Sequence, residues 1–169
     1  YNNLANLLCR KQELEDALRY ILHAIKYDPN FADAYNNLGK ILKSLSRIEE
    51  SSICFIKAIE LDSSKAIYYY NLGNTYCELF DFEKAVSSYD NAIHLNPNNS
   101  TFISSLLLAS SMISDWHKIE QFTPLIHKLG ITGDFVSPLN MLHLEDNPAN
   151  HLSRSLNCFK QNYKIKSQK

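Results

Sequence analysis

Residue types in this 169-residue chain recur at a fixed step of 34 residues. The positions that recur are aromatic, leucine, glycine or alanine: Tyr1, Tyr35 and Tyr69; Leu4, Leu38, Leu72 and Leu106; Gly39 and Gly73; Ala24, Ala58 and Ala92; Ile21, Phe55 and Tyr89. A period of this length is typical of repeat architectures, in which each unit buries its apolar face only by packing on its neighbours. The sequence therefore predicts an array of similar units.

Each unit is expected to be a hairpin of two helices. Apolar or small residues at i, i+3, i+4 and i+7 lie on one face of a helix. Two such sets follow one another in the second unit: Tyr35, Leu38, Gly39 and Leu42, then Ser51, Phe55 and Ala58. The missing side chain of Gly39 lets the second helix approach closely. A short turn at 46–48 separates the helices, and in the outer units Pro29 and Pro97 end the hairpin, because proline cannot continue a helix.

The repeated pattern resembles the tetratricopeptide repeat. The residues that carry this resemblance are Tyr69-x-x-Leu72-Gly73-x-x-Tyr76, Ala85, Tyr89, Ala92 and Pro97. The resemblance implies an all-α tetratricopeptide-repeat superhelix of antiparallel helical hairpins. It says little about function, since such repeats are general scaffolds.

The phase of the period divides the chain into three parts. Residues 1–99 hold three repeats, and the first lacks its opening residues, so we expect further repeats upstream. Residues 100–130 read as a degenerate fourth repeat, with Leu107 at the small position and Pro124 inside the expected second helix, where proline usually kinks or ends a helix. Residues 131–169 read as a helical connector, in which Ser137-Pro138 and Asn147-Pro148 each open a helix.

The last part carries a second resemblance, to bacterial protein O-GlcNAc transferase-type glycosyltransferases. It rests on Asp115-Trp116, on Phe135-Val136-Ser137-Pro138-Leu139-x-x-Leu142 and on Asp146-x-Pro148-Ala149-x-x-Leu152. In that family the repeats lead through a connector into two catalytic lobes that bind a sugar nucleotide. The resemblance implies that such lobes follow Lys169, and it assigns no catalytic residue to this chain.

Composition excludes several other functions. The net charge of −1 argues against a nucleic-acid binder with a basic surface. None of the six histidines has metal-ligand spacing, and no nucleophile elbow or phosphate-binding loop occurs. The longest apolar stretch, 103–113, is too short and too polar to span a membrane. We therefore expect a segment that is not catalytic by itself and has no metal, cofactor or membrane partner.

The cysteines indicate a reducing compartment. Cys9, Cys54, Cys77 and Cys158 form no C-x-x-C pair and are irregularly spaced. A zinc site or a disulfide scaffold would need regular spacing. We expect buried or half-buried free thiols and a cytoplasmic protein.

Asparagine is unusually frequent, with 17 residues, although it is a poor residue in helix interiors. Several asparagines fall on one face of the first helices: Asn3, Asn37 and Asn71 at one repeat position, Asn2 and Asn36 just before it, and Asn6 and Asn74 three residues further on. One amide per repeat, spaced by roughly 10 Å, makes a row that donates and accepts hydrogen bonds along an extended peptide. This resembles the asparagine ladder with which O-GlcNAc transferases hold protein substrates. The alternative is that these residues serve local packing.

Two functions follow from these patterns. In the first, the segment recognises and positions protein substrates for an O-GlcNAc transferase-like enzyme, whose UDP-sugar would bind only in a catalytic region outside this chain. In the second, it is a non-catalytic adaptor that holds partner proteins together.

Overall fold

A computed structural model of the chain describes residues 2–3, 14–126, 129 and 155, and these residues contain no strand. Asn2 and Asn3 are helical. The later helices are α2 (Leu14–Tyr27), α3 (Ala32–Ser44), α4 (Ile48–Leu61), α5 (Ala66–Glu78), α6 (Phe82–Leu95), α7 (Ser100–Met112) and α8 (Trp116–Ile126). Helix content thus follows the 34-residue period through the described part.

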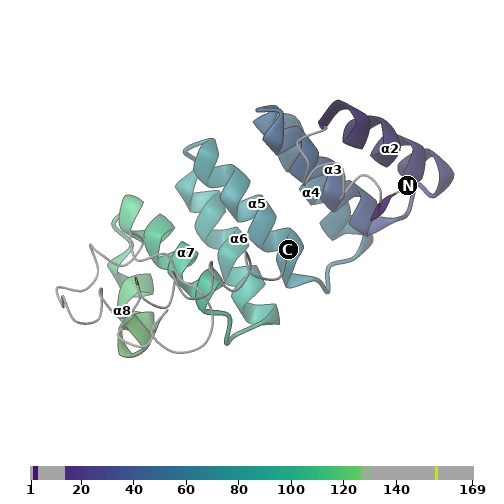
Figure 1. Cartoon of the computed structure of the whole chain (residues 1–169). Helices are drawn as coiled ribbons and strands as arrows, with labels where there is room; N and C mark the ends of the chain where they lie inside the picture. The colour runs from purple at the N-terminus through teal and green to yellow at the C-terminus, as the bar shows by residue number, and fades with distance from the viewer. Residues whose placement is uncertain (1, 4–13, 127–128, 130–154, 156–169) are drawn as a thin grey trace. The chain divides into compact units, whose positions relative to one another are not determined.

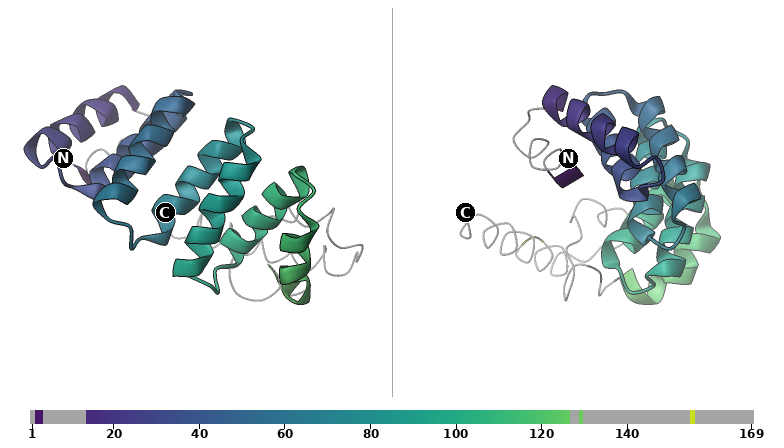
Figure 2. Two further views of the ribbon diagram at one scale, coloured as in Figure 1. Left: turned by 180° about the vertical axis from the view of Figure 1, so that it is seen from behind. Right: turned by 90° about the vertical axis from the view of Figure 1, so that its right-hand side faces the viewer.

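The chain divides into two compact units, residues 1–95 and 96–169. In the first unit, α3 packs on α4 and α5 packs on α6 as antiparallel hairpins (Figure 1). Neighbouring hairpins also contact each other, because α2 packs on α3 and α4 packs on α5. Figure 2 shows this order of α2 to α6 from behind and from the side. In the second unit, α7 packs on α8.

The hairpin core confirms the predicted inward positions. Ser51, Phe55 and Ala58 on α4 are fully buried, and so are their counterparts on α6. A Cβ atom added to Gly39 would lie 2.7 Å from Cε1 of Phe55, which is closer than real Cβ atoms come to another carbon. Gly73 faces the ring of Tyr89 in the same way, with 2.6 Å to Cε1. Glycine is needed at both positions because the aromatic ring of the second helix takes the space of a side chain.

The turns between α3 and α4, α5 and α6, and α7 and α8 each have a left-handed residue at the same repeat position. Ser46, Phe80 and Ser114 have φ angles of 60°, 60° and 57°. The Ser46 N–H donates to the carbonyl of Lys43 at 2.9 Å, and the N–H of Arg47 donates to the carbonyl of Leu42 at 2.9 Å. This hydrogen-bond pattern is a Schellman motif, in which glycine is usual at the left-handed position. The sequence has no glycine there, and the short turn was predicted without this backbone geometry.

The degenerate fourth repeat keeps the hairpin but changes its ends. Asn99 caps α7, since its Oδ1 accepts from the N–H groups of Thr101 and Phe102 at 3.0 and 3.1 Å. Leu107 replaces the glycine and is fully buried. Pro124 lies within α8, where it removes the one backbone hydrogen bond that its missing N–H would donate to the preceding turn.

Some predictions fall outside the described residues. They concern the helices opened by Ser137-Pro138 and Asn147-Pro148, together with Asn6, Cys9 and Cys158. Within the connector 131–169 only Ser155 is described, and it is helical.

Candidate functional site

The predicted asparagine row lies on the first helices of the stacked hairpins. Asn37 occupies α3 and Asn71 the matching position of α5, while Asn3 is exposed at the start of the chain. Asn36 and Asn37 have only 8% and 7% of their surface exposed, and Asn71 is partly buried. The row is therefore less open than a set of freely exposed amides.

The buried amides bind each other across the repeat boundaries. Nδ2 of Asn37 donates to Oδ1 of Asn2 at 2.7 Å. Nδ2 of Asn71 donates to Oδ1 of Asn36 at 2.8 Å. We call these two contacts, Asn2–Asn37 and Asn36–Asn71, the amide pairs. In each pair the donor is a row residue and the acceptor is the asparagine just before the row position of the preceding repeat. Asn2 and Asn36 therefore hold neighbouring repeats together.

Each amide pair leaves hydrogen-bonding capacity in the row. A primary amide has two N–H donors and a carbonyl oxygen with two lone pairs, and a pair uses one donor of its row residue. Among the described residues, Oδ1 of Asn37 and Oδ1 of Asn71 have no hydrogen-bond partner. These two oxygens are therefore acceptors that no described residue uses.

Asn74, the third predicted position, is used within its own repeat. Its Oδ1 accepts a hydrogen bond from the Tyr89 hydroxyl at 2.7 Å, and Sγ of Cys77 lies 3.5 Å from the same hydroxyl. Burial raises the pKa of Tyr89 well above its usual value. The Asn74 oxygen thus holds α6 against α5 and is already occupied, while the equivalent Asn6 lies outside the described residues.

A second polar cluster, not foreseen from the sequence, joins α3 to α5. The carboxylate of Asp33 accepts from Lys65 Nζ at 2.9 Å and from the Tyr68 hydroxyl at 2.5 Å. The Tyr68 hydrogen bond is the largest influence on Asp33 and lowers its pKa. Burial raises the pKa of Tyr68 to about 12, and its ring lies 5.5 Å from Lys65 Nζ. The repeat period does not indicate this contact, because Asp33 and Lys65 are charged residues at different repeat positions.

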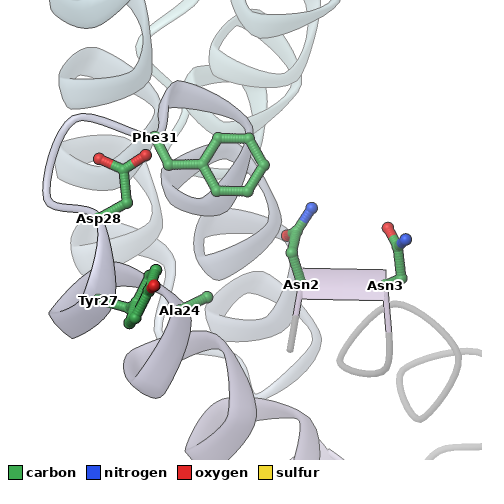
Figure 3. A pocket seen from close by; sticks show the side chains of 6 residues that line it. All are labelled: Asn2, Asn3, Ala24, Tyr27, Asp28 and Phe31. Atoms are coloured by element: carbon green, nitrogen blue, oxygen red, sulfur yellow. The ribbon is translucent and has the colours of Figure 1, made fainter.

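A pocket of about 390 Å³ opens beside the first amides of the row. The residues that line it come from the chain start, the end of α2 and the loop after it: Asn2, Asn3, Ala24, Tyr27, Asp28 and Phe31. Figure 3 shows Asn2 and Asn3 on one side and Tyr27 and Asp28 on the other, with the Phe31 ring between them. Tyr27 is 90% exposed. The pocket thus combines aromatic rings, amides and one carboxylate.

Other chemistry is sparse in the part of the chain that the structure describes. His23, His94 and His117 are exposed, and no group of three or more His, Cys, Asp or Glu side chains there could hold a metal ion. None of the described helices has the length and apolar character that crossing a bilayer requires. The site therefore offers hydrogen bonds, aromatic surface and charge, which suit binding.

The two described cysteines are free thiols. Cys54 and Cys77 are half-buried. Burial raises the pKa of Cys54 to about 11 and also raises the pKa of Cys77. Since the thiolate is the reactive form, neither is suited to nucleophilic chemistry near neutral pH.

Comparison with known families identifies the architecture. A model of the TPR repeat matches residues 5–46 and 39–79, and a model of the tetratricopeptide repeat matches residues 66–99, so together they cover more than half of the 169 residues. The chain belongs to the tetratricopeptide repeat family. The all-α repeat fold predicted from the period is thus confirmed for this tetratricopeptide repeat protein. Among curated proteins, a sequence search finds no match to it.

Solved tetratricopeptide repeat structures share this fold at low sequence identity. MamA is 20% identical over 96% of both chains, with a TM-score of 0.65. YrrB, described as a TPR protein with an unusual peptide-binding site, is 20% identical over 96% of this chain and 77% of its own, with a TM-score of 0.66. The first TPR of Spaghetti (RPAP3), bound to the HSP90 peptide SRMEEVD, is 18% identical over 67% of this chain and 90% of its own, with a TM-score of 0.65.

Proposed function

We propose that the stacked hairpins bind an extended peptide segment of a partner protein along the face that carries Asn3, Asn37 and Asn71. The observation that carries this proposal is that Asn37 and Asn71, at one position of successive repeats, are each held by an amide pair and keep a side-chain oxygen that no described residue uses. Two of the similar solved structures are described as peptide-bound or peptide-binding, which supports the same class of ligand.

The amide pairs favour recognition of main chain over side chain. Each pair fixes its row amide by a hydrogen bond of 2.7 or 2.8 Å, so the free oxygen is held in one orientation before a ligand arrives. A preorganised acceptor loses little conformational entropy on binding. Every residue of an extended peptide except proline offers an N–H donor, so such a row imposes little demand on the peptide sequence.

The matched variants Asn71→Ala and Asn36→Ala test this proposal. Both break the Asn36–Asn71 amide pair, but only Asn71→Ala removes an oxygen of the row. A peptide is first selected from a phage-displayed random library on the 169-residue chain, and its Kd for each variant is measured by isothermal titration calorimetry. A neutral hydrogen bond contributes about 0.5–1.5 kcal/mol, so we expect Asn71→Ala to weaken binding about two- to tenfold more than Asn36→Ala does.

The stability of both variants is measured in parallel by urea unfolding. Equal loss of stability with unequal loss of affinity supports a ligand contact at Asn71. Equal loss of affinity would assign these asparagines to packing between repeats, and failure of any peptide to be enriched would refute peptide binding by this face.

For the parent protein, we propose the role implied by the resemblance, which is delivery of protein substrates to an O-GlcNAc transferase-like glycosyltransferase. Its support is the resemblance at Asp115-Trp116 and in the connector motifs, whose positions after residue 130 lie outside the described residues. The adaptor role needs only the repeats and is equally compatible with the peptide-binding proposal. The coding sequence after Lys169 decides between them, since sugar-nucleotide-binding lobes support the transferase and a stop codon there refutes it.

A further inference from the structure

The described lining of the pocket beside Asn2 and Asn3 combines a carboxylate with aromatic rings. Its lining includes the carboxylate of Asp28 and the rings of Tyr27 and Phe31, and none of its described lining residues carries a positive charge. Oδ1 of Asp28 accepts from the N–H of Asn30 at 3.0 Å, which fixes the carboxylate and leaves its second oxygen for another donor.

The equivalent positions of the next repeat place a lysine near the aspartate. Asp62 corresponds to Asp28 at the 34-residue step, and its Oδ1 accepts from the N–H of Ser64 at 3.0 Å in the same turn geometry. Lys65 stands where the first repeat has Phe31. Its ammonium lies 2.9 Å from Asp33, 3.9 Å from Asp62 Oδ2 and 5.5 Å from the centre of the Tyr68 ring. Of these three partners, Asp62 is the one that corresponds to a residue of the pocket, Asp28, and in the second repeat the chain itself supplies a cation near that carboxylate.

We propose that the pocket of the first repeat binds a lysine or arginine side chain of the bound peptide beside Asp28, as Lys65 Nζ lies near Asp62 in the second repeat. Phe31 stands at the position equivalent to Lys65 and brings an aromatic ring in place of an ammonium group, and the exposed ring of Tyr27 adds a second aromatic surface. A cation beside an aromatic face and a carboxylate gains from both electrostatic terms. The pocket volume of about 390 Å³ is ample for a long basic side chain.

This inference rests on the proposed function, because the pocket adjoins the first amides of the row. Asn2 takes part in an amide pair and also lines the pocket. A peptide lying along the row toward Asn3 would therefore present one of its side chains to Asp28. The inference adds a requirement for a basic residue at one end of the bound peptide, whose other contacts with the row are made by its main chain.

The test selects peptides on the 169-residue chain from the phage-displayed random library and then compares two synthetic peptides. One is the selected peptide, expected to carry arginine or lysine at one fixed position, and the other has methionine there. Calorimetry with the wild type, Asp28→Asn and the matched control Asp62→Asn gives a double-mutant cycle. We expect Asp28→Asn to weaken the basic peptide about tenfold and the methionine peptide little, because a charge-assisted contact is lost only in the first case.

Asp62→Asn should leave both affinities unchanged, because the ammonium group of Lys65 already lies near the Asp62 carboxylate. Added salt should weaken only the basic peptide. Enrichment of an apolar or acidic residue at the fixed position, or equal effects of Asp28→Asn on the two peptides, would overturn the cation pocket while leaving peptide binding intact. Enrichment of no peptide would overturn the proposed function and this inference with it.

Discussion

Replacing Ser51 by alanine is expected to make the protein more stable. The Ser51 side chain is 0% exposed, and its Oγ has no hydrogen-bond partner among the residues that the structure describes. The first and third repeats have alanine at this position, and Ala17 and Ala85 are equally buried against their first helices. The second repeat therefore buries a hydroxyl in a space that its neighbours fill with a methyl group.

The size of the effect follows from the desolvated hydroxyl. A buried polar group without a partner costs about 1–3 kcal/mol, and alanine adds a helix-propensity gain of about 0.5 kcal/mol. Loss of the packing of one oxygen atom offsets part of this gain. We expect the free energy of unfolding of Ser51→Ala to rise by about 1–2 kcal/mol, which raises the Tm by roughly 2–8 °C for a chain of this size.

The assay is urea unfolding followed by circular dichroism, with Ser88→Ala as the matched control. Ser88 is also buried in a second helix, but its Oγ donates to the carbonyl of Lys84 at 2.7 Å. Both substitutions gain the same helix propensity, so the difference between them isolates the unpaired hydroxyl. If Ser51→Ala gains no more stability than Ser88→Ala, the reasoning from the unpaired oxygen is wrong.

Three other substitutions test the hairpin and the repeat junction. Gly39→Ala should destabilise the chain by about 1–2 kcal/mol in urea unfolding, because its Cβ would lie 2.7 Å from the buried ring of Phe55; unchanged stability would contradict the close approach. Ser46→Gly should stabilise by about 0.5–1 kcal/mol, because glycine adopts the φ of 60° without strain; a loss of stability would contradict this account of the turn. The pKa of Tyr68 is raised from about 10 to about 12, so the neutral hydroxyl stabilises the fold fully below pH 10 and this contribution is lost as the pH rises through 12. The stability difference between the wild type and Tyr68→Phe, measured from pH 8 to 12, should shrink over that window, and a constant difference would refute the linkage.

The sequence predicted the hairpins well because burial is what a repeat period encodes. Phe55 and Gly39 recur in type at 34-residue steps, since each second helix must fit the same first helix. The period also gave Asn37 and Asn71 matching positions on the first helices of their hairpins, as the structure has them. It could not predict that Asn37 bonds to Asn2, because that contact depends on how closely two first helices approach.

The left-handed turns were missed for a different reason. Serine and phenylalanine disfavour a positive φ, so Ser46 and Phe80 carry no local signal for it. The geometry comes from the two hydrogen bonds that close the end of the first helix, together with the packing of the second helix. Cross-repeat contacts such as Lys65 with Asp33 likewise depend on side-chain reach that a periodic pattern does not describe.

The amide pairs also bear on how a stack of hairpins unfolds. In a linear array, stability divides into the intrinsic stability of each hairpin and a nearest-neighbour coupling at each boundary. Asn2–Asn37 and Asn36–Asn71 belong to the coupling, because each hydrogen bond joins two neighbouring hairpins. A ligand that contacts the amides of adjacent hairpins adds to the same coupling. Its binding should therefore make unfolding more concerted, with neighbouring hairpins lost together instead of fraying one by one from an end.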